Sequence, residues 1–342
     1  MRPVIRSAAL LSLLSLAMAA WALRGIAQPT AQSFASRVER LSEEGGDFDT
    51  DNLISNERSY LEVVPALKAA GVSGGAYIGV GPDQNFSYIA QVRPVIAFIV
   101  DIRRDNLLLH LLFKALFTSA QNRIEYVSLL TGRPPPGRLE TWRDASLERI
   151  VAYVDDARPT ADAGRLDRRL RDIISGFGVP LTAADFSTIQ RFHHTFIDAG
   201  LSLKFESRGR PPRSAYPTLR DLLLATDRAG HSWNYLASER DFQFVRSLQT
   251  QDLVIPVVGD LGGQHALAAI ADLLIARGDH LSAFYISNVE TYLYGDKSSQ
   301  FVKNLARLPR DAHSTIIRSV FTASISSSEI QPAGRFLAAN PP

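Results

Sequence analysis

Two glycines followed by a distant aspartate form the first group of residues that could bind a ligand. Gly79 and Gly81 end a short apolar run, and Asp101 ends the next apolar run about twenty residues later. Glycines at a strand end let the backbone approach a ligand, and a carboxylate ending the next strand can accept hydrogen bonds from a ribose diol. Gln84 replaces the third glycine of the dinucleotide-binding pattern, so a plain Gly-Pro turn beside a buried sheet is the alternative.

Polar residues after two later apolar runs form a second group. Asp260 follows the run 253–258, and Asn288 follows the run 281–286. Open α/β sheets bind ligands outside the carboxyl ends of their strands, although both residues also suit helix N-caps. The sequence therefore predicts one crevice, with cofactor-binding residues Gly79, Gly81, Asp83, Asn85, Asp101, Asp260 and Asn288 and substrate-binding residues Arg103, Glu290 and Tyr292.

Arg103 and Arg104 directly follow the strand that ends at Asp101. Guanidinium groups in that position could bind a carboxylate or phosphate through two parallel hydrogen bonds. Equally, the two arginines could pair in solvent with Asp105 and Glu57.

The residue types exclude several other kinds of site. The chain has no cysteine, which rules out disulfides and thiolate metal ligands. His193 and His194 are adjacent and point to different faces of a helix, so no metal site is expected. No Gly-x-Ser-x-Gly motif is present, and no catalytic residue is predicted. A formal net charge of +2 gives no field that would attract nucleic acid, so no nucleic-acid partner is expected.

The elements that must position these residues follow an α/β pattern. Uninterrupted apolar runs are typical of strands in a parallel sheet that is covered on both faces. Strands are predicted at 76–80, 95–100, 253–258, 281–286 and 314–320, the last with an antiparallel edge position as one option, and helices at 57–70, 84–92, 106–120 and 264–276. Pro256 argues against a central place for its strand. The predicted fold is a three-layer, Rossmann-like, mostly parallel sheet with a helical insertion or cap.

The composition divides the chain into segments. Residues 122–247 are rich in Arg and Asp, have mainly helical periodicity and offer one strand candidate, Leu201 to Phe205. The predicted organisation is a signal peptide at 1–27, a linker with a short helix at 28–54, a Rossmann-like domain in two parts at 55–121 and 248–328, the insertion at 122–247 and a C-terminal tail at 329–342.

The N-terminus has the layout of a secretory signal. Arg2 and Arg6 precede an apolar run of about sixteen residues, and small residues suit cleavage after Ala19 or Ala27. An uncleaved anchor is the alternative, although a membrane span needs about 20 apolar residues. The protein is therefore predicted to be exported, periplasmic or secreted, with no membrane span after cleavage.

The motifs at the strand ends resemble a known family. Residues 76–83 together with Asp101 resemble motifs I and II of class I S-adenosylmethionine (SAM)-dependent methyltransferases. More widely, the chain resembles an uncharacterised bacterial family with that methyltransferase-like fold, on the stretches 55–57, 79–86, 100–104, 258–263 and 287–293. The resemblance implies a glycine loop that contacts SAM and an Asp101 carboxylate that binds its ribose.

The predicted function is that of an exported, methyltransferase-like protein. It binds a small polar, nucleoside-containing ligand at the strand ends, as a SAM-dependent methyltransferase with no metal. The alternative is a non-catalytic envelope or periplasmic protein that retains the fold and binds a ligand or partner. The oligomeric state is not predicted.

Overall fold

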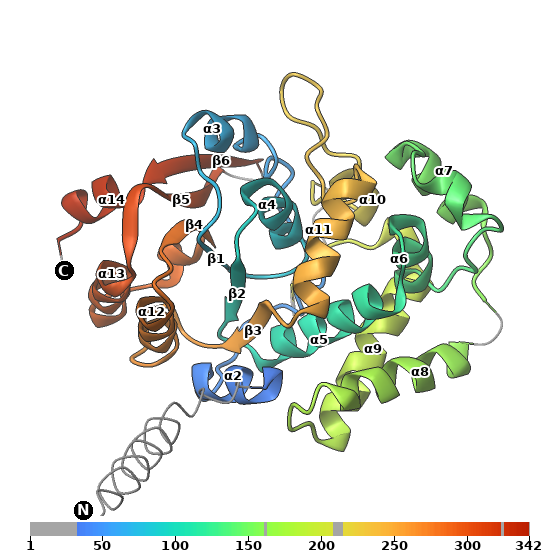
Figure 1. Ribbon diagram of the computed structural model, residues 1–342, viewed down its shortest axis with the longest axis horizontal. Helices are drawn as coiled ribbons and strands as arrows, with labels where there is room; N and C mark the ends of the chain where they lie inside the picture. Colours follow the sequence, from blue (N-terminus) through green and yellow to red (C-terminus); the bar gives the residue numbers. More distant parts are fainter. Residues whose placement is uncertain (1–32, 161–162, 208–214, 323–324, 342) are drawn as a thin grey trace, which may run out of the picture. The chain divides into compact units, whose positions relative to one another are not determined.

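Five parallel strands, four of them mainly apolar, make up most of a six-stranded sheet (Figure 1). The structure is a computed structural model that describes residues 33–160, 163–207, 215–322 and 325–341. The strands are β1 (Ala76–Gly79), β2 (Ile96–Asp101), β3 (Val254–Val258), β4 (Leu281–Ser287), β5 (Arg310–Thr322) and β6 (Ile325–Pro332). Their order across the sheet is β3-β2-β1-β4-β5-β6, and only β6 is antiparallel to its neighbour.

Helices connect the parallel strands. The α-helices are α2 (Phe34–Leu41), α3 (Val64–Ala69), α4 (Gln84–Val92), α5 (Arg104–Ser119), α6 (Arg123–Leu130), α7 (Leu147–Asp156), α8 (Ala163–Gly176), α9 (Ala183–Ala199), α10 (Leu219–Leu223), α11 (Glu239–Thr250), α12 (Ala266–Arg277), α13 (Asp296–Arg307) and α14 (Ala333–Ala339). Short 3₁₀ helices are η1 (Leu139–Trp142), η2 (Gly200–Ser202) and η3 (Val289–Tyr292). Helices α4, α5 and α11 pack together, as do α12, α13 and α14 in sequence. The core lies between the helices and the sheet, and β1 and β3 are buried along their whole length.

This architecture confirms the predicted α/β class and the mostly parallel sheet, which is compatible with a Rossmann-like fold. Pro256 is accommodated because β3 is an edge strand that pairs with β2 alone. The last predicted strand is not at the edge: β5 pairs in parallel with β4 and on its other side with β6. Strand β6 and helix α14 lie largely where a tail was expected.

The predicted insertion, 122–247, contains helices α6 to α10 and most of α11, which are drawn from green to orange-yellow beside the sheet in Figure 1. Its strand candidate is wrong. Residues Leu201 to Phe205 contain the end of η2 and one isolated bridge between Lys204 and Thr218. Gly200 is the C-cap of α9, immediately before this stretch, so the chain turns here where an extended strand was predicted.

The segment before β1 is packed more closely than its composition suggests. Phe34, Val38 and Leu41 of α2 are buried, and α2 contacts β3 and α12. The helix predicted at 57–70 is restricted to α3, because the chain before it forms turns that bury Glu57.

The predicted signal segment, 1–27, lies outside the described residues. Across the part of the chain that the structure does describe, no helix has the length and apolar character needed to cross a membrane.

Candidate functional site

A cavity of about 330 Å³ lies at the carboxyl ends of strands β1 to β4. It straddles the point where β1 has β2 on one side and β4 on the other, the switch point at which open α/β sheets bind ligands. The lining includes Gly81 after β1, Asp101 at the end of β2, Asp260 after β3 and Asn288 after β4. The structure therefore brings together four of the residues predicted for the crevice, and Arg103 and Tyr292 line the same cavity.

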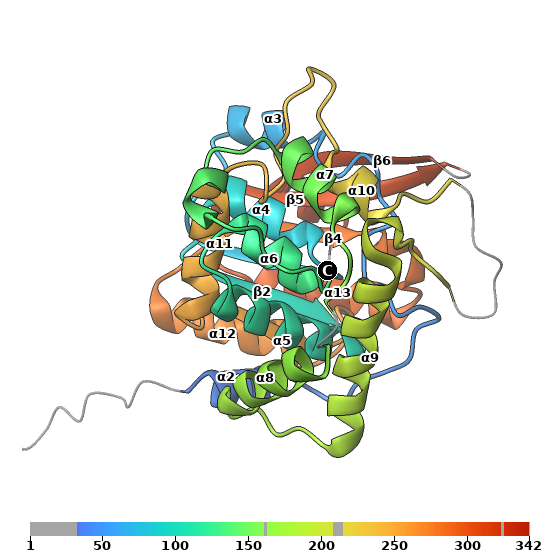
Figure 2. The same cartoon turned by 90° about the vertical axis from the view of Figure 1, so that its right-hand side faces the viewer.

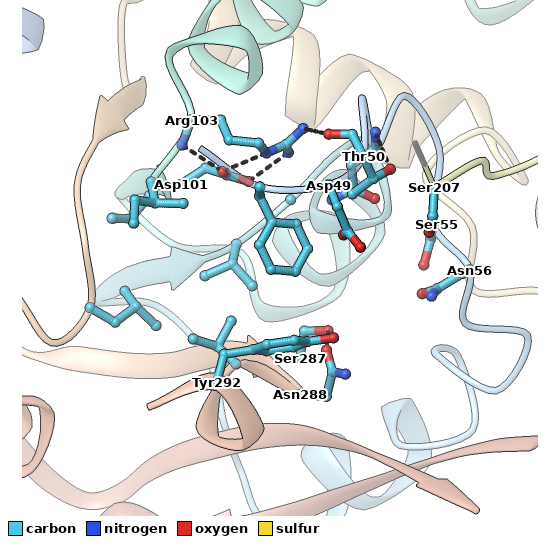
Figure 3. A pocket seen from close by; sticks show the side chains of 18 of the residues that line it. Asp49, Thr50, Ser55, Asn56, Asp101, Arg103, Ser207, Ser287, Asn288 and Tyr292 are labelled. Atoms are coloured by element: carbon cyan, nitrogen blue, oxygen red, sulfur yellow. Dashed lines mark hydrogen bonds and ion pairs between the residues drawn. The ribbon is translucent and has the colours of Figure 1, made fainter. Parts of the chain in front are cut away.

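Asp101 and Arg103 form a buried ion pair on one side of this cavity (Figure 3). The Arg103 guanidinium donates to both carboxylate oxygens, at 3.1 and 3.0 Å, and the Arg103 backbone N–H donates to Asp101 Oδ1 at 2.9 Å. The side chains are only 11% and 6% exposed. Arg103 is thus occupied within the protein, and Asp101 keeps only its remaining lone pairs for a ligand.

Arg104 points elsewhere. Its guanidinium pairs with Asp185 of α9 at 3.0 Å, away from the residues that line the cavity. The hydrogen-bond partners of the Glu57 carboxylate are Ser287 and Ser319, so neither arginine makes the alternative pair with Glu57.

Three other predicted residues, Gly79, Asn85 and Glu290, do not line the cavity. Asn85 is completely buried; its amide N–H donates to the carbonyls of Val80 and Pro82 at 2.8 and 2.7 Å. It therefore shapes the glycine loop from beneath. Glu290 pairs with Arg318 at 3.4 Å.

Asp83 is likewise outside the cavity lining, in a buried position before α4. The Tyr235 hydroxyl lies 3.4 Å from its carboxylate. Burial raises the pKa of Asp83 from its ordinary value of 3.8 to about 7, because the Tyr235 hydroxyl and a backbone hydrogen bond offset only part of the loss of water.

Asp83→Asn should reduce the pH dependence of stability. Between pH 3.8 and about 7 the folded protein binds a proton at Asp83 that the unfolded chain has released, so stability falls as pH rises through this window. Relative to Asp83→Asn, the unchanged protein should lose roughly 2–3 kcal/mol between pH 5 and pH 8. Urea unfolding at both pH values measures this difference, and equal losses for the two proteins would contradict the ionisation of Asp83.

Glu57 is a site residue that the sequence analysis did not identify. It lines the cavity, is 1% exposed and accepts hydrogen bonds from the hydroxyls of Ser287 and Ser319. Burial raises its pKa, and the two hydroxyls oppose that shift. Ser287 has a φ of 52°, a conformation that non-glycine residues adopt mainly where function or local structure requires it. A proton-transfer role for Glu57 is chemically feasible.

Residues 43–57, here called the cover segment, form another part of the cavity wall. Arg103 Nη1 donates to the carbonyls of Thr50 and Asp51 at 2.7 and 2.9 Å. The Glu43 carboxylate accepts from the Asp260 backbone N–H at 2.9 Å. Phe48 contacts Tyr292 edge-to-face, with ring centroids 5.1 Å apart. The cover segment thus joins the ends of β2, β3 and β4, as Figure 3 shows around Thr50.

The cavity has an acidic lining. Its carboxyl side chains are those of Asp47, Asp49, Glu57, Asp101 and Asp260. Its cationic side chains, Arg103 and Lys297, are each paired with one of those carboxylates, at 3.0 and 2.7 Å. Within the described ranges no group of three or more His, Cys, Asp or Glu residues is arranged to hold a metal ion. The lining therefore suits a ligand rich in hydrogen-bond donors or positive charge.

Comparison with known proteins places the chain in a family. No curated protein matches it. One family model matches residues 53–135 and 213–337, more than half of the chain, and these segments contain all six strands. The unmatched residues 136–212 include helices α7, α8 and α9. The protein thus belongs to the family described as Domain of unknown function (DUF7790).

Proposed function

We propose that the protein binds a small ribose-bearing ligand, with SAM as the candidate, in the cavity at the strand ends. The observation that supports this most is the position of the Gly81 turn and the Asp101 carboxylate on neighbouring strands at the switch point. Gly81 has a φ of 80°, which a glycine adopts without strain, so the loop can stay close to a ligand. The methyltransferase-like fold and SAM chemistry are part of this proposal.

The residues present fit such a ligand. Gln84 lines the cavity, is 7% exposed, and its Oε1 has no hydrogen-bond partner among the described residues. A buried acceptor of this kind gains a partner when a ligand N–H or O–H binds. The acidic lining also suits the positive sulfonium of SAM.

In the proposed reaction SAM would supply a methyl group bound to a sulfonium. Asp101 would accept hydrogen bonds from the ribose hydroxyls through the lone pairs that Arg103 leaves open. Glu57 would accept the proton that an O–H or N–H acceptor loses. Catalysis would consist mainly of aligning the two reactants, which needs no covalent enzyme intermediate.

Titration with SAM, S-adenosylhomocysteine and adenosine tests the proposal. Calorimetry should show binding, and Asp101→Asn should weaken it by roughly ten- to a hundredfold per folded molecule, the scale of a hydrogen bond to a charged group. Asp105→Asn, on the first turn of α5 and outside the cavity lining, is the matched control. Absence of binding by all three compounds at millimolar concentration would refute a nucleoside site.

A non-catalytic envelope protein that retains the fold is the second candidate. It is favoured by the ion pair with Arg103, because the guanidinium donates to both oxygens of the Asp101 carboxylate that is proposed to bind the ribose. The predicted export, which remains to be tested, would also favour this candidate, since SAM is made in the cytoplasm. A fusion of residues 1–50 to a reporter active only in the periplasm, with sequencing of the mature N-terminus between Ala20 and Gln28, distinguishes the two. Intact Met1 on cytoplasmic protein would remove export and this candidate with it.

A further inference from the structure

A second cavity, of about 300 Å³, lies between α8 and α9. Both helices pack against α5 and are drawn in yellow-green next to it in Figures 1 and 2. Leu112 of α5 forms part of its lining. We call this space the α8–α9 cavity.

The α8–α9 cavity combines apolar walls with positive charge. Leu170, Ile174 and Ile189 supply apolar surface. Arg168 and Arg171 are exposed and also line the cavity, and neither forms an ion pair with another described residue. Arg171 lies over the Phe186 ring at 4.2 Å, which holds its guanidinium beside the opening. The charge and the apolar surface together suit an amphipathic anion.

A buried histidine in the same cavity lacks a hydrogen bond. His193 is 1% exposed, and its Nε2 lies 2.9 Å from the Leu129 carbonyl, which can only accept, so Nε2 donates. Nδ1 has no hydrogen-bond partner among the described residues. Asp167 Oδ1 lies 3.8 Å away, too far for a direct hydrogen bond. An oxygen about 2.8 Å from both atoms fits that separation.

The Asp167 carboxylate is a fixed acceptor at this position. His194 and Gln190 donate to its other oxygen at 2.8 and 2.9 Å. These hydrogen bonds leave Oδ1 directed toward His193. Nδ1 of His193 and Oδ1 of Asp167 can each accept a hydrogen bond, so a ligand hydroxyl placed between them donates its proton to one of the two atoms.

The geometry points to the α8–α9 cavity as a binding site for a small hydroxy acid. Its carboxylate pairs with Arg168 and Arg171, its apolar body contacts the leucine and isoleucine side chains, and its hydroxyl lies between His193 and Asp167 and donates to one of them. This site is separate from the cavity at the strand ends and does not depend on the function proposed for that cavity. It also lies mainly in residues 136–212, outside the matched family segments.

Calorimetry on the full chain tests the site with 4-hydroxybenzoate and 6-hydroxyhexanoate. At least one should bind with a Kd of about 1 mM or below, and more tightly than benzoate or hexanoate, which lack the hydroxyl. Arg168→Gln should weaken binding about tenfold or more, since the charged partner is lost. Arg169→Gln, an exposed neighbour on α8 outside the cavity lining, should leave it unchanged.

The variant His193→Gln tests whether His193 recognises the ligand hydroxyl or only fills space in the protein core. It should abolish the preference for a hydroxy acid over its deoxy partner while retaining the carboxylate interaction. The inference is overturned if neither hydroxy acid binds below about 10 mM. Binding that survives Arg168→Gln, or that is lost instead in Glu57→Gln at the strand ends, overturns it as well.

Discussion

Arg103→Met should lower the free energy of unfolding by about 3–5 kcal/mol, the usual cost of leaving a buried ion unpaired. The substitution removes the partner of the Asp101 carboxylate and the donor to the Thr50 and Asp51 carbonyls. Water cannot replace these contacts, because the Asp101 side chain is 11% exposed. Urea unfolding of the two proteins measures the loss.

Arg104→Met is the matched control, one residue further along the chain. The Arg104 side chain is 46% exposed, and its pair with Asp185 should contribute less than about 1 kcal/mol. The double variant Asp101→Asn, Arg103→Met should lose less than the sum of its single variants, because no buried charge is then left unpaired. Strict additivity would show that the ion pair does not connect the two residues energetically.

Gly79→Ala should cost more than about 4 kcal/mol or prevent folding, because the new methyl group has no space. A Cβ at this position would overlap Asn85 Oδ1 and lie 2.8 Å from the Tyr77 hydroxyl. Neither group can move easily, since Tyr77 donates to Asn85 at 2.8 Å and the Asn85 amide is bonded to the loop. The yield of folded protein and its urea midpoint measure the effect.

Gly334→Ala gives the opposite expectation. Gly334 lies in α14, and a methyl group added to it would meet no atom within 4 Å apart from its neighbours in the chain and the backbone of its own helix, so alanine should stabilise the protein by up to about 1 kcal/mol. A Gly79→Ala protein as stable as Gly334→Ala would show that the Tyr77–Asn85 contacts can rearrange.

The centre of the parallel sheet could be predicted from the sequence because β1, β2 and β3 come from unbroken apolar runs and the run of β4 is interrupted only by Ser282. A few consecutive apolar residues are enough to indicate a strand that is buried on both faces of the sheet. Strand β6 has no such signal: its residues 326–328 are serines, and its pairing with β5 is a property of the sheet edge. The local sequence of β6 therefore does not indicate that it pairs with β5.

The site was predicted in part for the same reason. Strand ends can be located from local patterns, which placed Gly81, Asp101, Asp260 and Asn288 at one edge of the sheet. Glu57 could not be found in this way, because it does not follow a predicted strand and its hydrogen-bond partners, Ser287 and Ser319, are more than 200 positions away. Asn85 was assigned to the cofactor, whereas its amide is used to fix the loop that surrounds it.

The position of the cover segment also has a consequence for biosynthesis. Residues 43–57 leave the ribosome before any strand of the sheet, yet Glu43 bonds to Val258 and Asp260. The cover segment is therefore synthesised early, and it cannot make these contacts until more than 200 further residues have been added. Contacts of such long sequence separation form slowly. A nascent chain should consequently pass through a stage in which the sheet is growing and the future ligand cavity is still open.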